Sequence, residues 1–528
     1  MSEKKQPNIL FLFSDEHNFR FMGHVSEEEG GEPVHTPNFD KLASQGTVFK
    51  NAYCQMPLCT PSRICMLSGR EVRNAGAWNN KTVMDPDLPT IPKILGTAGY
   101  TTCLVGKMHF GGSLQFNGFQ HRPYGDITGN TGHQEDPLIN LIEKRKGDNL
   151  NVLASRTRDA GVTEIPESRL QEEVVAQESI AFLREHENAN PDKPWFLCAS
   201  FSRPHFPLTS AKRFIDRYWP EGVTEPIAPA AGDAYDHPMS VGMRKGFNVD
   251  RISHDEMMWA RACYFACVTH IDQIIGDLLV RLEASGLLEN TVIIYSTDHG
   301  EMAGEHGTWW KNGWYEACTH IPMIVSLPEQ RNGTQPAQEV EEAVGLYDLF
   351  PTFCGLADVD VPDDVQAGLD GVDLTGVLQG NAAAPDRPVV CDNLIPRWGE
   401  GTEFRAIRQG QYKYVCFRNA EPLFFDLAND QNEQRNLIGK ATGEAAAMLA
   451  QLQAYAAETL DFEAAAQERI ESSERLNAAY PLDLEKKSML NQFIMPNGQL
   501  VEADDTLYTP TVLAENPADV FPDWPQFA

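Results

Sequence analysis

Residues 9–17, ILFLFSDEH, join a continuous apolar run, ILFLF, to four polar residues that follow it directly. An apolar run without alternation is typical of a strand that is buried on both faces of a sheet. Such strands belong to α/β proteins, in which helices cover both faces of a mostly parallel sheet. Ligands of these sheets bind beyond the carboxyl ends of the strands, so Asp15, Glu16 and His17 are candidate site residues.

The same strand pattern recurs along the chain, with helical patterns between the runs. Further apolar runs occupy residues 100–105, 195–201, 292–296 and 321–326. Residues 37–46 predict a short helix, and residues 255–284 predict a long amphipathic helix that ends at Gly286. This alternation predicts an α/β fold with a large, mostly parallel (mixed) central sheet flanked by helices.

The pattern changes after residue 384. Residues 404–427, FRAIRQGQYKYVCFRNAEPLFFDL, predict three short strands joined by turns at 409–410 and 419–422, which indicates a small antiparallel sheet. Residues 444–479 are rich in Ala and Glu and predict a helix. We therefore expect a main α/β domain over 1–384, a smaller subdomain over 385–479, and a Pro-rich tail over 480–528. The tail is expected to be either an oligomerisation arm or partly disordered.

The amino-acid composition limits the kinds of molecule that the protein is expected to bind. The chain has 528 residues and a formal net charge of −32, a balance that disfavours nucleic acid and anionic membranes as partners. An anionic substrate would therefore need a local basic pocket. The 11 cysteines form no CxxC pair, which is typical of a reducing compartment. Neither a signal peptide nor an apolar run of membrane-spanning length is evident, so we expect a cytoplasmic protein, or a periplasmic one if a leader was removed.

Two polar groups far apart in sequence follow predicted strands and could share a metal ion. Asp15 and Glu16 end the first strand, and Asp298 and His299 end the strand at 292–296. A single Asp in such a place is usually a helix cap or a turn residue, but two groups at one sheet edge favour a common hard cation. The imidazole of His299 suits manganese or zinc better than calcium.

Residues 59–63, CTPSR, place a thiol beside a predicted helix start. Thr60 is a candidate N-cap and Pro61 a favoured first helical residue, so Cys59 lies at the positive end of the helix. Arg63 is one turn away from Cys59. The residues alone indicate a reactive cysteine of low pKa. A buried structural role fits Cys65 better than Cys59.

Four further groups carry positive charge or a titratable proton. Lys107 and His109 lie two residues apart, His205 lies between two prolines, and Lys311 lies among tryptophans. Each alone has an ordinary explanation, as a solvated lysine or a hydrogen-bonded histidine. Together with a cation and a helix N-terminus, they predict a receptor for a tetrahedral oxyanion.

Residues 59–63 resemble the sulfatase signature C-x-P-S-R. Other segments resemble that family in the same order: residues 14–17 (SDEH), 99–111 (GYTTCLVGKMHFG), 296–307 (STDHGEMAGEHG), 347–357 (YDLFPTFCGLA) and 424–437 (FFDLANDQNEQRNL). On this basis the sequence is identified as a member of the formylglycine-dependent type I sulfatases of the alkaline phosphatase superfamily. The resemblance covers about residues 7–437 and implies that 1–384 is the catalytic domain.

The resemblance implies a sulfuric ester hydrolase that cleaves the S–O bond of sulfate monoesters. A formylglycine-generating enzyme would oxidise Cys59, and the aldehyde hydrate on a divalent cation would attack sulfur to give a covalent sulfate hemiacetal. Asp15, Glu16, Asp298 and His299 would hold the cation together with residue 59. Calcium is the expected ion, with magnesium or manganese as alternatives. The family usually has Asp or Gln where this chain has Glu16.

The resemblance also assigns roles around the nucleophile. Arg63 would orient the hydrate, and Lys107 and Lys311 would bind sulfate oxygens. His109 would act as the base during breakdown of the intermediate. The leaving oxygen would take its proton from His205, with Lys311 as the competing donor. Asn80 resembles an asparagine that contacts the oxyanion in some bacterial members.

Two alternatives remain open at this stage. The superfamily includes phosphonate monoester and phosphodiester hydrolases, although the spacing of Lys107 and His109 resembles the sulfatase branch. A non-catalytic oxyanion-binding protein would keep Cys59 as a thiol. The expected substrate is a small aryl, alkyl or sugar sulfate. Three tryptophans could stack on its leaving group or pack around the site: Trp309, Trp310 and Trp314.

Overall fold

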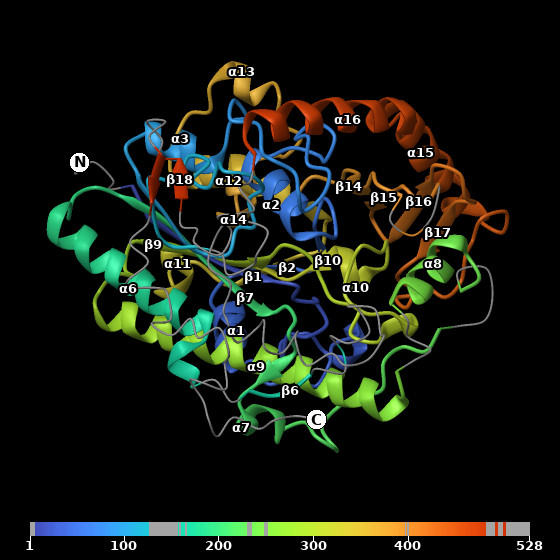
Figure 1. Ribbon diagram of the computed structural model, residues 1–528, viewed down its shortest axis with the longest axis horizontal. Coiled ribbons are helices and arrows are strands. Elements are labelled where there is room, and N and C mark those ends of the chain that lie inside the picture. Colours follow the sequence, from blue (N-terminus) through green and yellow to red (C-terminus); the bar gives the residue numbers. More distant parts are fainter. Residues whose placement is uncertain are drawn as a thin grey trace.

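The computed structural model of the chain is built around one large sheet with helices on both faces (Figure 1). It describes residues 6–125, 157, 160–163, 166–229, 235–247, 252–396, 398, 401–481, 492–494 and 500–502. A second, smaller sheet lies to one side of the molecule, coloured orange in Figure 1. The predicted fold class is therefore confirmed.

The central sheet has eight strands in the order β12-β2-β11-β9-β1-β7-β4-β5. Their bounds are β1 (Asn8–Asp15), β2 (Thr47–Phe49), β4 (Thr101–Gly106), β5 (His121–Tyr124), β7 (Trp195–Pro204), β9 (Thr291–Thr297), β11 (Met323–Ser326) and β12 (Gln338–Val340). The five strands from β5 to β9 in this order are parallel, whereas β11 runs antiparallel to both of its neighbours. The carboxyl ends of β1, β4, β7 and β9 consequently meet at one edge.

Strand β1 is buried on both faces, as its apolar run predicts. Ile9, Phe11 and Phe13 enter one core, and Leu10 and Leu12 enter the other. Helices on the first face are α2 (Cys59–Ser68), α3 (Ile91–Thr97) and α12 (Leu349–Leu356). Helices on the second face are α1 (Pro37–Ser44), α6 (Gln171–Ala189) and α9 (His254–Ala284). Figure 1 shows the two groups of helices on opposite sides of the sheet.

Helix α9 is the long helix expected from the sequence. Ser253 begins it with a capping box that includes Glu256, and Gly286 follows its end with a left-handed φ of 73°. Among the described residues, α9 is the one helix long and apolar enough to cross a membrane. Because 78% of its apolar window is buried inside the protein, α9 is a core helix.

The predicted strand over 321–326 is wrong as a single element. Residues His320–Ile321 form β10, which pairs with β3 (Ala52–Tyr53) in a separate three-stranded sheet completed by β13 (Val344–Gly345). Only β11 joins the central sheet. Pro322 lies between the two strands and has no N–H group to continue a ladder.

The C-terminal sheet is antiparallel. It contains β14 (Val389–Asn393), β15 (Phe404–Gln409), β16 (Tyr412–Phe417) and β17 (Leu423–Asp426). The three predicted strands are confirmed, and β14 adds a fourth. The helical stretch 444–479 is two helices, α15 (Gly443–Thr459) and α16 (Phe462–Ala479), because Asp461 caps the second one.

Shorter elements connect these parts: η1 (Glu27–Glu29), β6 (Gly161–Val162), η2 (Glu167–Arg169), β8 (Thr209–Ser210), α7 (Lys212–Ile215), α8 (Pro238–Phe247), η4 (Glu305–Gly307), α10 (Glu316–Thr319), α11 (Pro328–Arg331), η5 (Leu346–Asp348), α13 (Asp363–Gln366), α14 (Thr375–Leu378), β18 (Gln492–Ile494) and β19 (Leu500–Glu502). The predicted domain limits at 384 and 479 stay predictions. The predicted oligomerisation arm at 480–528 falls largely outside the described residues.

Candidate active site

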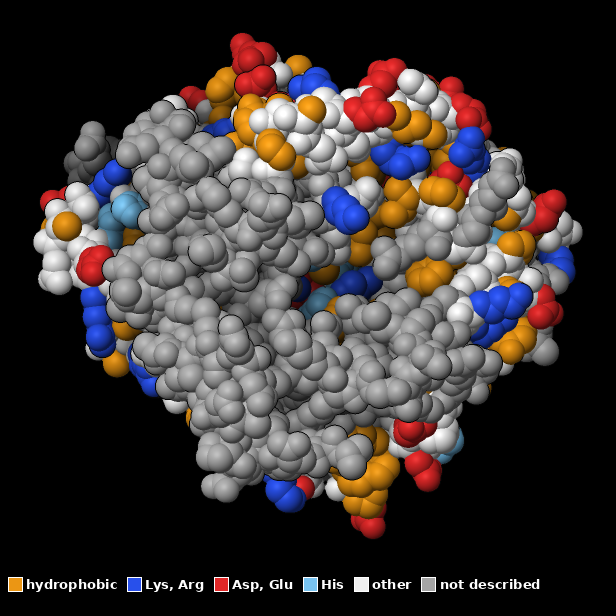
Figure 2. Space-filling model, in the orientation of Figure 1, with side chains coloured by type: hydrophobic (Ala, Val, Ile, Leu, Met, Phe, Trp, Pro, Cys, Tyr) orange, Lys and Arg blue, Asp and Glu red, His pale blue; other side chains and the backbone are white. Residues whose placement is uncertain are grey.

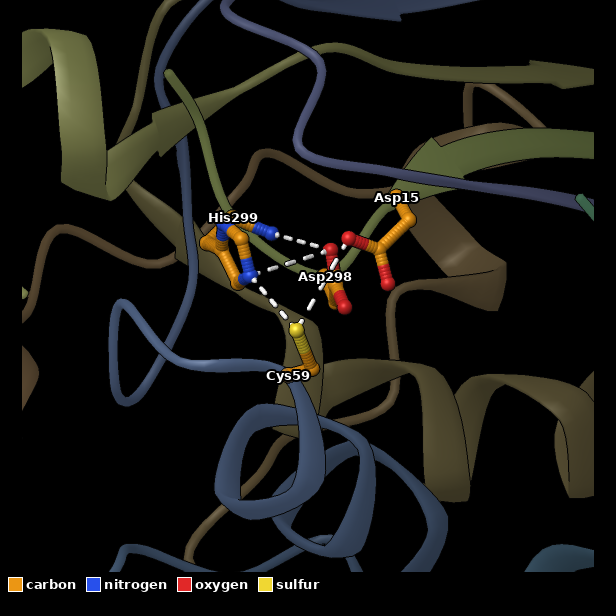
Figure 3. A group of neighbouring side chains, drawn as sticks. All are labelled: Asp15, Cys59, Asp298 and His299. Atoms are coloured by element: carbon orange, nitrogen blue, oxygen red, sulfur yellow. Dashed lines mark hydrogen bonds and ion pairs between the residues drawn. The ribbon is translucent and has the colours of Figure 1, made fainter. Parts of the chain in front are cut away.

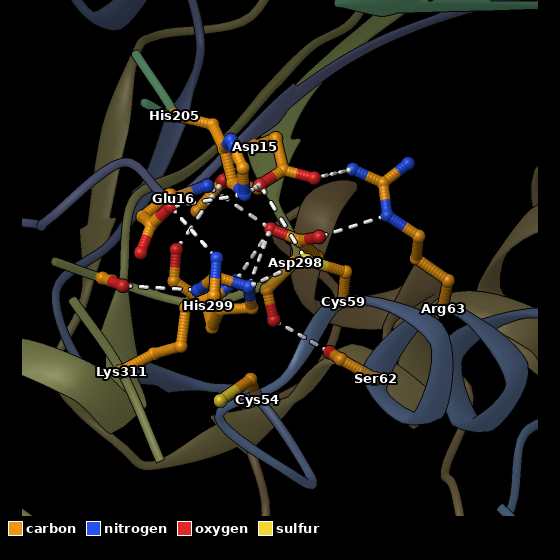
Figure 4. Close-up of polar contacts among 12 residues, drawn as sticks. Asp15, Glu16, Cys54, Cys59, Ser62, Arg63, His205, Asp298, His299 and Lys311 are labelled. Carbon is orange, nitrogen blue, oxygen red and sulfur yellow. Dashed lines mark hydrogen bonds and ion pairs between the residues drawn. The ribbon is translucent and has the colours of Figure 1, made fainter. Parts of the chain in front are cut away.

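Polar residues at the ends of four parallel strands lie close together, and Figure 4 shows those that belong to β1, β7 and β9. Asp15 ends β1, Lys107 follows β4, His205 follows β7 and Asp298 follows β9. The register of β1 against β7 shifts just before this point, so that Asp15 lies opposite Pro204. The sheet therefore brings together residues as far apart in sequence as Glu16 and Asp298, which are 282 positions apart.

Four side chains form a buried group with the donor set of a metal site. Asp15, Cys59, Asp298 and His299 each offer one atom, and these atoms all lie within 4.8 Å of one another. Figure 3 shows the four side chains pointing toward a common centre. The Cys59 Sγ lies 3.3 Å from His299 Nε2 and 3.7 Å from Asp15 Oδ1. Two carboxylates and an imidazole in a buried site fit a divalent cation.

Glu16 belongs to a second group, with Asp15 and His205. Its Oε2 lies 2.8 Å from Lys311 Nζ and 3.4 Å from His205 Nε2. Glu16 has a left-handed φ of 66°, and its backbone N–H donates to Asp298 Oδ1 at 3.1 Å. Its carboxylate therefore pairs with Lys311, and its role as a metal ligand stays a prediction.

Helix α2 begins at Cys59, so the expectation that Thr60 is its N-cap is wrong. The N-cap position is Leu58, and the Thr60 hydroxyl donates instead to the carbonyl oxygen of His109 at 2.6 Å. The cap comes from outside the helix, because Asn80 Oδ1 accepts from the Thr60 N–H at 3.1 Å. Asn80, predicted to contact substrate, is thus placed on the helix end beside Cys59.

The charges around Cys59 favour its anion. Burial and the carboxylate of Asp15 raise the pKa of the thiol, but the positive charges of Lys311, Lys107 and His299 outweigh them. The pKa of Cys59 consequently lies well below its ordinary value. A group that carries negative charge at this position is stabilised by its surroundings, whether that group is a thiolate or another anion.

Arg63 binds the two carboxylates of the metal group. Its Nη2 lies 2.7 Å from Asp15 Oδ2 and its Nε lies 2.8 Å from Asp298 Oδ2, and all three side chains have an exposed fraction of 0%. A third bond from Nη1 reaches the carbonyl oxygen of Lys107 at 2.6 Å. The predicted role of Arg63 was to orient residue 59; the structure places its guanidinium on the carboxylates beside that residue.

The two lysines are each paired with an acid of the site. Lys107 Nζ lies 2.8 Å from Asp15 Oδ2, and Lys311 Nζ pairs with Glu16. Burial lowers the pKa of Lys107, but Asp15 and Cys59 raise it, and the sum lies above the ordinary value. The pKa of Lys311 is raised by Cys59 and Glu16 against the effect of burial. Both lysines are therefore charged at neutral pH.

The two histidines differ in what the structure shows. His205 Nδ1 lies 2.6 Å from the carbonyl oxygen of Phe206, and burial, Lys107 and Lys311 lower the pKa of His205 to about 3. His109 has a left-handed φ of 57°, so its backbone is not extended. The predicted role of His109 as a base stays a prediction.

Sequence reasoning missed several residues that build the site. Ser62 Oγ donates to the carbonyl oxygen of Asp298 at 2.5 Å, and Glu301 Oε1 accepts from the N–H of Trp310. His17, by contrast, was a candidate only because it follows Glu16; its ring bonds to the Tyr295 hydroxyl at 2.5 Å. The serine of the CTPSR stretch was visible in the sequence, but its partner was not.

A comparison with known families gives the identity that this geometry suggests. The family profile described as Sulfatase matches residues 7–359, which carry every predicted site residue. The chain belongs to the sulfatase family. A second profile, described as N-sulphoglucosamine sulphohydrolase, C-terminal, matches residues 304–459. The sulfatase is therefore a hydrolase with an alkaline-phosphatase-like fold.

Similar proteins agree with this assignment. The sulfatase is 29% identical over 449 residues to the choline-sulfatase of Rhizobium meliloti, covering 83% of each chain. It is 28% identical over 460 residues to an arylsulfatase of Clostridium perfringens, covering 82% of this chain and 90% of the relative. Both relatives carry names of sulfate ester hydrolases.

Similar solved structures have lower sequence identities, of 24% and 21%, and therefore support the fold but not the activity. A protein solved with its substrate D-glucosamine-2-N,6-O-disulfate has a TM-score of 0.65 and 24% identity, covering 88% of this sulfatase and 99% of that chain. The phosphonate monoester hydrolase of Silicibacter pomeroyi has a TM-score of 0.66 and 21% identity, covering 94% and 99%. The fold is thus shared with a protein that has a disulfated glucosamine as its substrate and with a phosphonate monoester hydrolase.

The surroundings of the site bear on how the sulfatase meets its substrate. Figure 2 shows a hollow near the middle of one face, with basic and histidine side chains visible at its bottom. Trp309, Trp310 and Trp314 have exposed fractions of 2%, 3% and 0%, so all three rings are buried inside the protein. Phe206 is half-buried, and its ring centre lies 3.8 Å from that of His205.

Proposed function

We propose that this sulfatase hydrolyses sulfate monoesters with an oxidised side chain at position 59 as its nucleophile. The observation that carries the proposal is the convergence of Cys59, within the C-x-P-S-R pattern, with Asp15, Asp298 and His299 at 0% exposure. Two charged lysines, Lys107 and Lys311, complete the surroundings. Such a site suits a substrate that gains negative charge on its oxygens in the transition state.

One divalent cation would be held by Asp15, Asp298, His299 and residue 59, with Glu16 as a further predicted ligand. Calcium is the proposed ion, and magnesium or manganese would also accept this donor set. When bound, the ion lowers the pKa of a hydroxyl group and offsets the charge of sulfate oxygens. Arg63 keeps the two carboxylates in place on the side away from the ligand atoms.

The nucleophile is proposed to arise when a formylglycine-generating enzyme converts Cys59 to an aldehyde. In that step an external oxidant takes up two electrons and the sulfur leaves as sulfide, and the aldehyde then adds water. One hydroxyl of this hydrate gives up its proton and attacks sulfur, and the bond from sulfur to the ester oxygen breaks. That oxygen takes a proton from His205 or Lys311, so the leaving group departs as a neutral alcohol or phenol. In the structure Lys311 carries a proton at neutral pH and His205 does not.

Release of sulfate uses the second hydroxyl on the same carbon. His109 is proposed to take its proton, the carbon–oxygen bond to the sulfo group breaks, and the aldehyde returns. Sulfate leaves with the bonding electron pair, and a water molecule restores the hydrate. Lys107 and Lys311 are proposed to bind the sulfo oxygens throughout, since their ammonium groups are already held at the site.

The proposed substrate is a small aryl, alkyl or sugar sulfate. The names of the two relatives, a choline-sulfatase and an arylsulfatase, support small sulfate esters. The net charge of −32 supports a protein without nucleic acid or membrane partners. We also propose a cytoplasmic location, or a periplasmic one for a chain with a leader, and association of copies through the C-terminal tail.

The test compares kcat/KM for matched 4-nitrophenyl esters of sulfate and of phenylphosphonate. A clear preference for the sulfate is expected, and a preference for the phosphonate would favour the phosphonate monoester hydrolase alternative. A panel of aryl sulfates, sugar sulfates and choline sulfate then identifies the leaving group. A Cys59→Ala variant of undiminished activity would refute the proposed nucleophile, and inactive wild-type protein with an unmodified thiol would favour an oxyanion-binding role.

A further inference from the structure

Lys311 lies in a backbone segment whose conformation is unfavourable unless neighbouring groups stabilise it. The residues on both sides of it, Trp310 and Asn312, have φ values of 64° and 74°. Side chains other than glycine adopt this left-handed conformation at an energetic cost, and it persists where neighbouring groups fix it. The position of the Lys311 ammonium group therefore depends on what holds residues 310 and 312.

Asn312 is held from two sides. Its N–H donates to the carbonyl oxygen of Pro57 at 3.0 Å, which ties it to the segment just before Cys59. Its carbonyl oxygen accepts from Asn393 Nδ2 at 3.3 Å and from Trp398 Nε1 at 3.1 Å. Asn393 ends strand β14 and Trp398 lies between β14 and β15 in the sequence, so one donor belongs to the C-terminal sheet and the other to the segment that connects two of its strands.

A second contact with the same sheet follows four residues later. Lys413 Nζ lies 2.8 Å from Glu316 Oε1 and 2.7 Å from Glu433 Oε1, and Glu433 Oε2 accepts from the Glu316 N–H at 2.7 Å. All three side chains are buried. Between the two contacts, the Trp314 ring stacks on Phe425 of β17 at 5.3 Å. Residues 312–316 are thus bound to the C-terminal sheet along their length.

We propose that the C-terminal sheet positions Lys311 for catalysis, and that Asn393 and Trp398 are the positioning residues through which it acts. The inference rests on the proposed role of Lys311 in binding the sulfo group. The carbonyl group that they bind belongs to Asn312, the residue after Lys311. Removing both donors leaves the buried carbonyl oxygen of Asn312 without these two hydrogen bonds. The left-handed turn then relaxes, and the Lys311 ammonium group moves from its place beside Glu16.

The assignment gives the sheet a role at the active site as well as in packing. The positioning residues lie beyond residue 359, where the match to the sulfatase profile ends. Displacement of a transition-state contact by about 1 Å costs up to about 100-fold in rate. We therefore expect a measurable loss of activity from a change in a side chain that does not touch the substrate.

The test is a double-mutant cycle with Lys311. Asn393→Leu combined with Trp398→Phe removes both donors and keeps similar side-chain volumes. In the wild-type background this pair is expected to lower kcat/KM for 4-nitrophenyl sulfate about tenfold. In the Lys311→Ala background the same pair is expected to change it less than about twofold, because the group it positions is gone.

A matched control separates positioning from loss of stability. Asn436→Leu removes an acceptor that binds the N–H groups of Phe424 and Ile438, at 3.1 Å each, on the other face of the same sheet. Thermal unfolding is measured for all variants. The control is expected to lower the unfolding temperature without lowering kcat/KM. Trp398→Phe alone serves as the milder variant if the pair does not fold.

The affinity for inorganic sulfate, measured by calorimetry, gives a readout that needs no turnover. This affinity should be weaker in the Asn393→Leu, Trp398→Phe variant and in Lys311→Ala. The triple variant should be no weaker than Lys311→Ala, because the two effects are not additive. If the pair lowers kcat/KM and sulfate affinity equally in both backgrounds, the positioning role is overturned while the role of Lys311 stands. If Lys311→Ala leaves both quantities unchanged, the proposed function of Lys311 fails first, and the inference with it.

Discussion

The Nε of Arg63 lies 2.8 Å from Oδ2 of Asp298, which joins helix α2 to the residue that follows strand β9. The same guanidinium binds Asp15 at the end of β1, and none of these side chains is exposed. Burial raises the pKa of Asp15, but Lys107, His205 and Arg63 hold it well below its ordinary value. The negative charges of Asp15 and Asp298, two of the candidate metal ligands, are thus offset by positively charged side chains of the same protein.

Removal of Arg63 should therefore unfold the protein more easily. Arg63→Met leaves two buried carboxylates without their shared cation, and we expect a loss of about 3–5 kcal/mol in the free energy of unfolding. Urea denaturation measures the change. Arg475→Met is the control, because Arg475 is 62% exposed in its pair with Asp85 and should have little effect. Similar losses for the two variants would contradict the assigned role of Arg63.

The identity of residue 59 decides the nucleophile. Peptide mass spectrometry of protein made together with a formylglycine-generating enzyme should show the sulfur of Cys59 replaced by an aldehyde oxygen. Protein made without that enzyme should keep the thiol, and its kcat/KM should be lower by at least about 1000-fold. Cys65, six residues on and buried in the core, is the internal control and should stay unmodified. Full activity with an intact thiol would rule out the aldehyde.

Metal affinity distinguishes the two ligand groups. Asp298→Asn removes a charge from the group around Cys59, and it should weaken calcium binding by at least about 100-fold. Glu16→Gln should weaken it about tenfold, since the Glu16 carboxylate shares its charge with Lys311 at 2.8 Å. Calorimetry on metal-free protein measures both, and elemental analysis of the purified protein identifies the native ion. Equal effects would place Glu16 among the principal ligands.

The sequence predicts those parts of the site that depend on strand ends. An apolar run marks β1 and β9, and the first acids after each run, Asp15 and Asp298, follow from the rule that parallel strands end at one edge. Cys59 follows from a short motif. These predictions need only local patterns and the topology of the sheet.

Contacts between side chains that are far apart in sequence cannot be predicted from such local patterns. The pairing of Glu16 with Lys311 joins residues 295 positions apart, and the cap that Asn80 gives to helix α2 replaces the one expected from Thr60. The split of residues 321–326 between two sheets likewise depends on which strands lie nearby. The antiparallel strand β14, which carries Asn393, was not predicted, since it ends in Asp392 and Asn393, two residue types that are depleted in strands.

The proton donor to the leaving group is tested by varying the leaving group. His205→Asn and Lys311→Ala are compared on a series of aryl sulfates of rising phenol pKa. The variant that lacks the donor should lose most activity on the poorest leaving groups and least on 4-nitrophenyl sulfate. Because His205 has a pKa of about 3 in the structure, we expect the steeper dependence for Lys311→Ala. A steeper dependence for His205→Asn would assign the proton to His205.

Asp272 in helix α9 gives a pH dependence that is separate from catalysis. Burial raises its pKa to about 7, although it accepts N–H bonds from Asn38 and Phe39 at the start of α1. In the unfolded chain the pKa is about 3.9. The folded state therefore binds the proton more tightly, and the stability from this group is greatest below about pH 4 and lost as the pH rises to about 7.

Asp272→Asn removes the titration and keeps an oxygen for the same N–H groups. The free energy of unfolding of the wild type, relative to this variant, should fall by about 1–3 kcal/mol between pH 5 and pH 8. Urea denaturation at both pH values gives the difference. Asp360→Asn, on an exposed loop, should show no such change relative to the wild type. A relative stability that rises with pH would mean that the N–H bonds to Asp272 outweigh its burial.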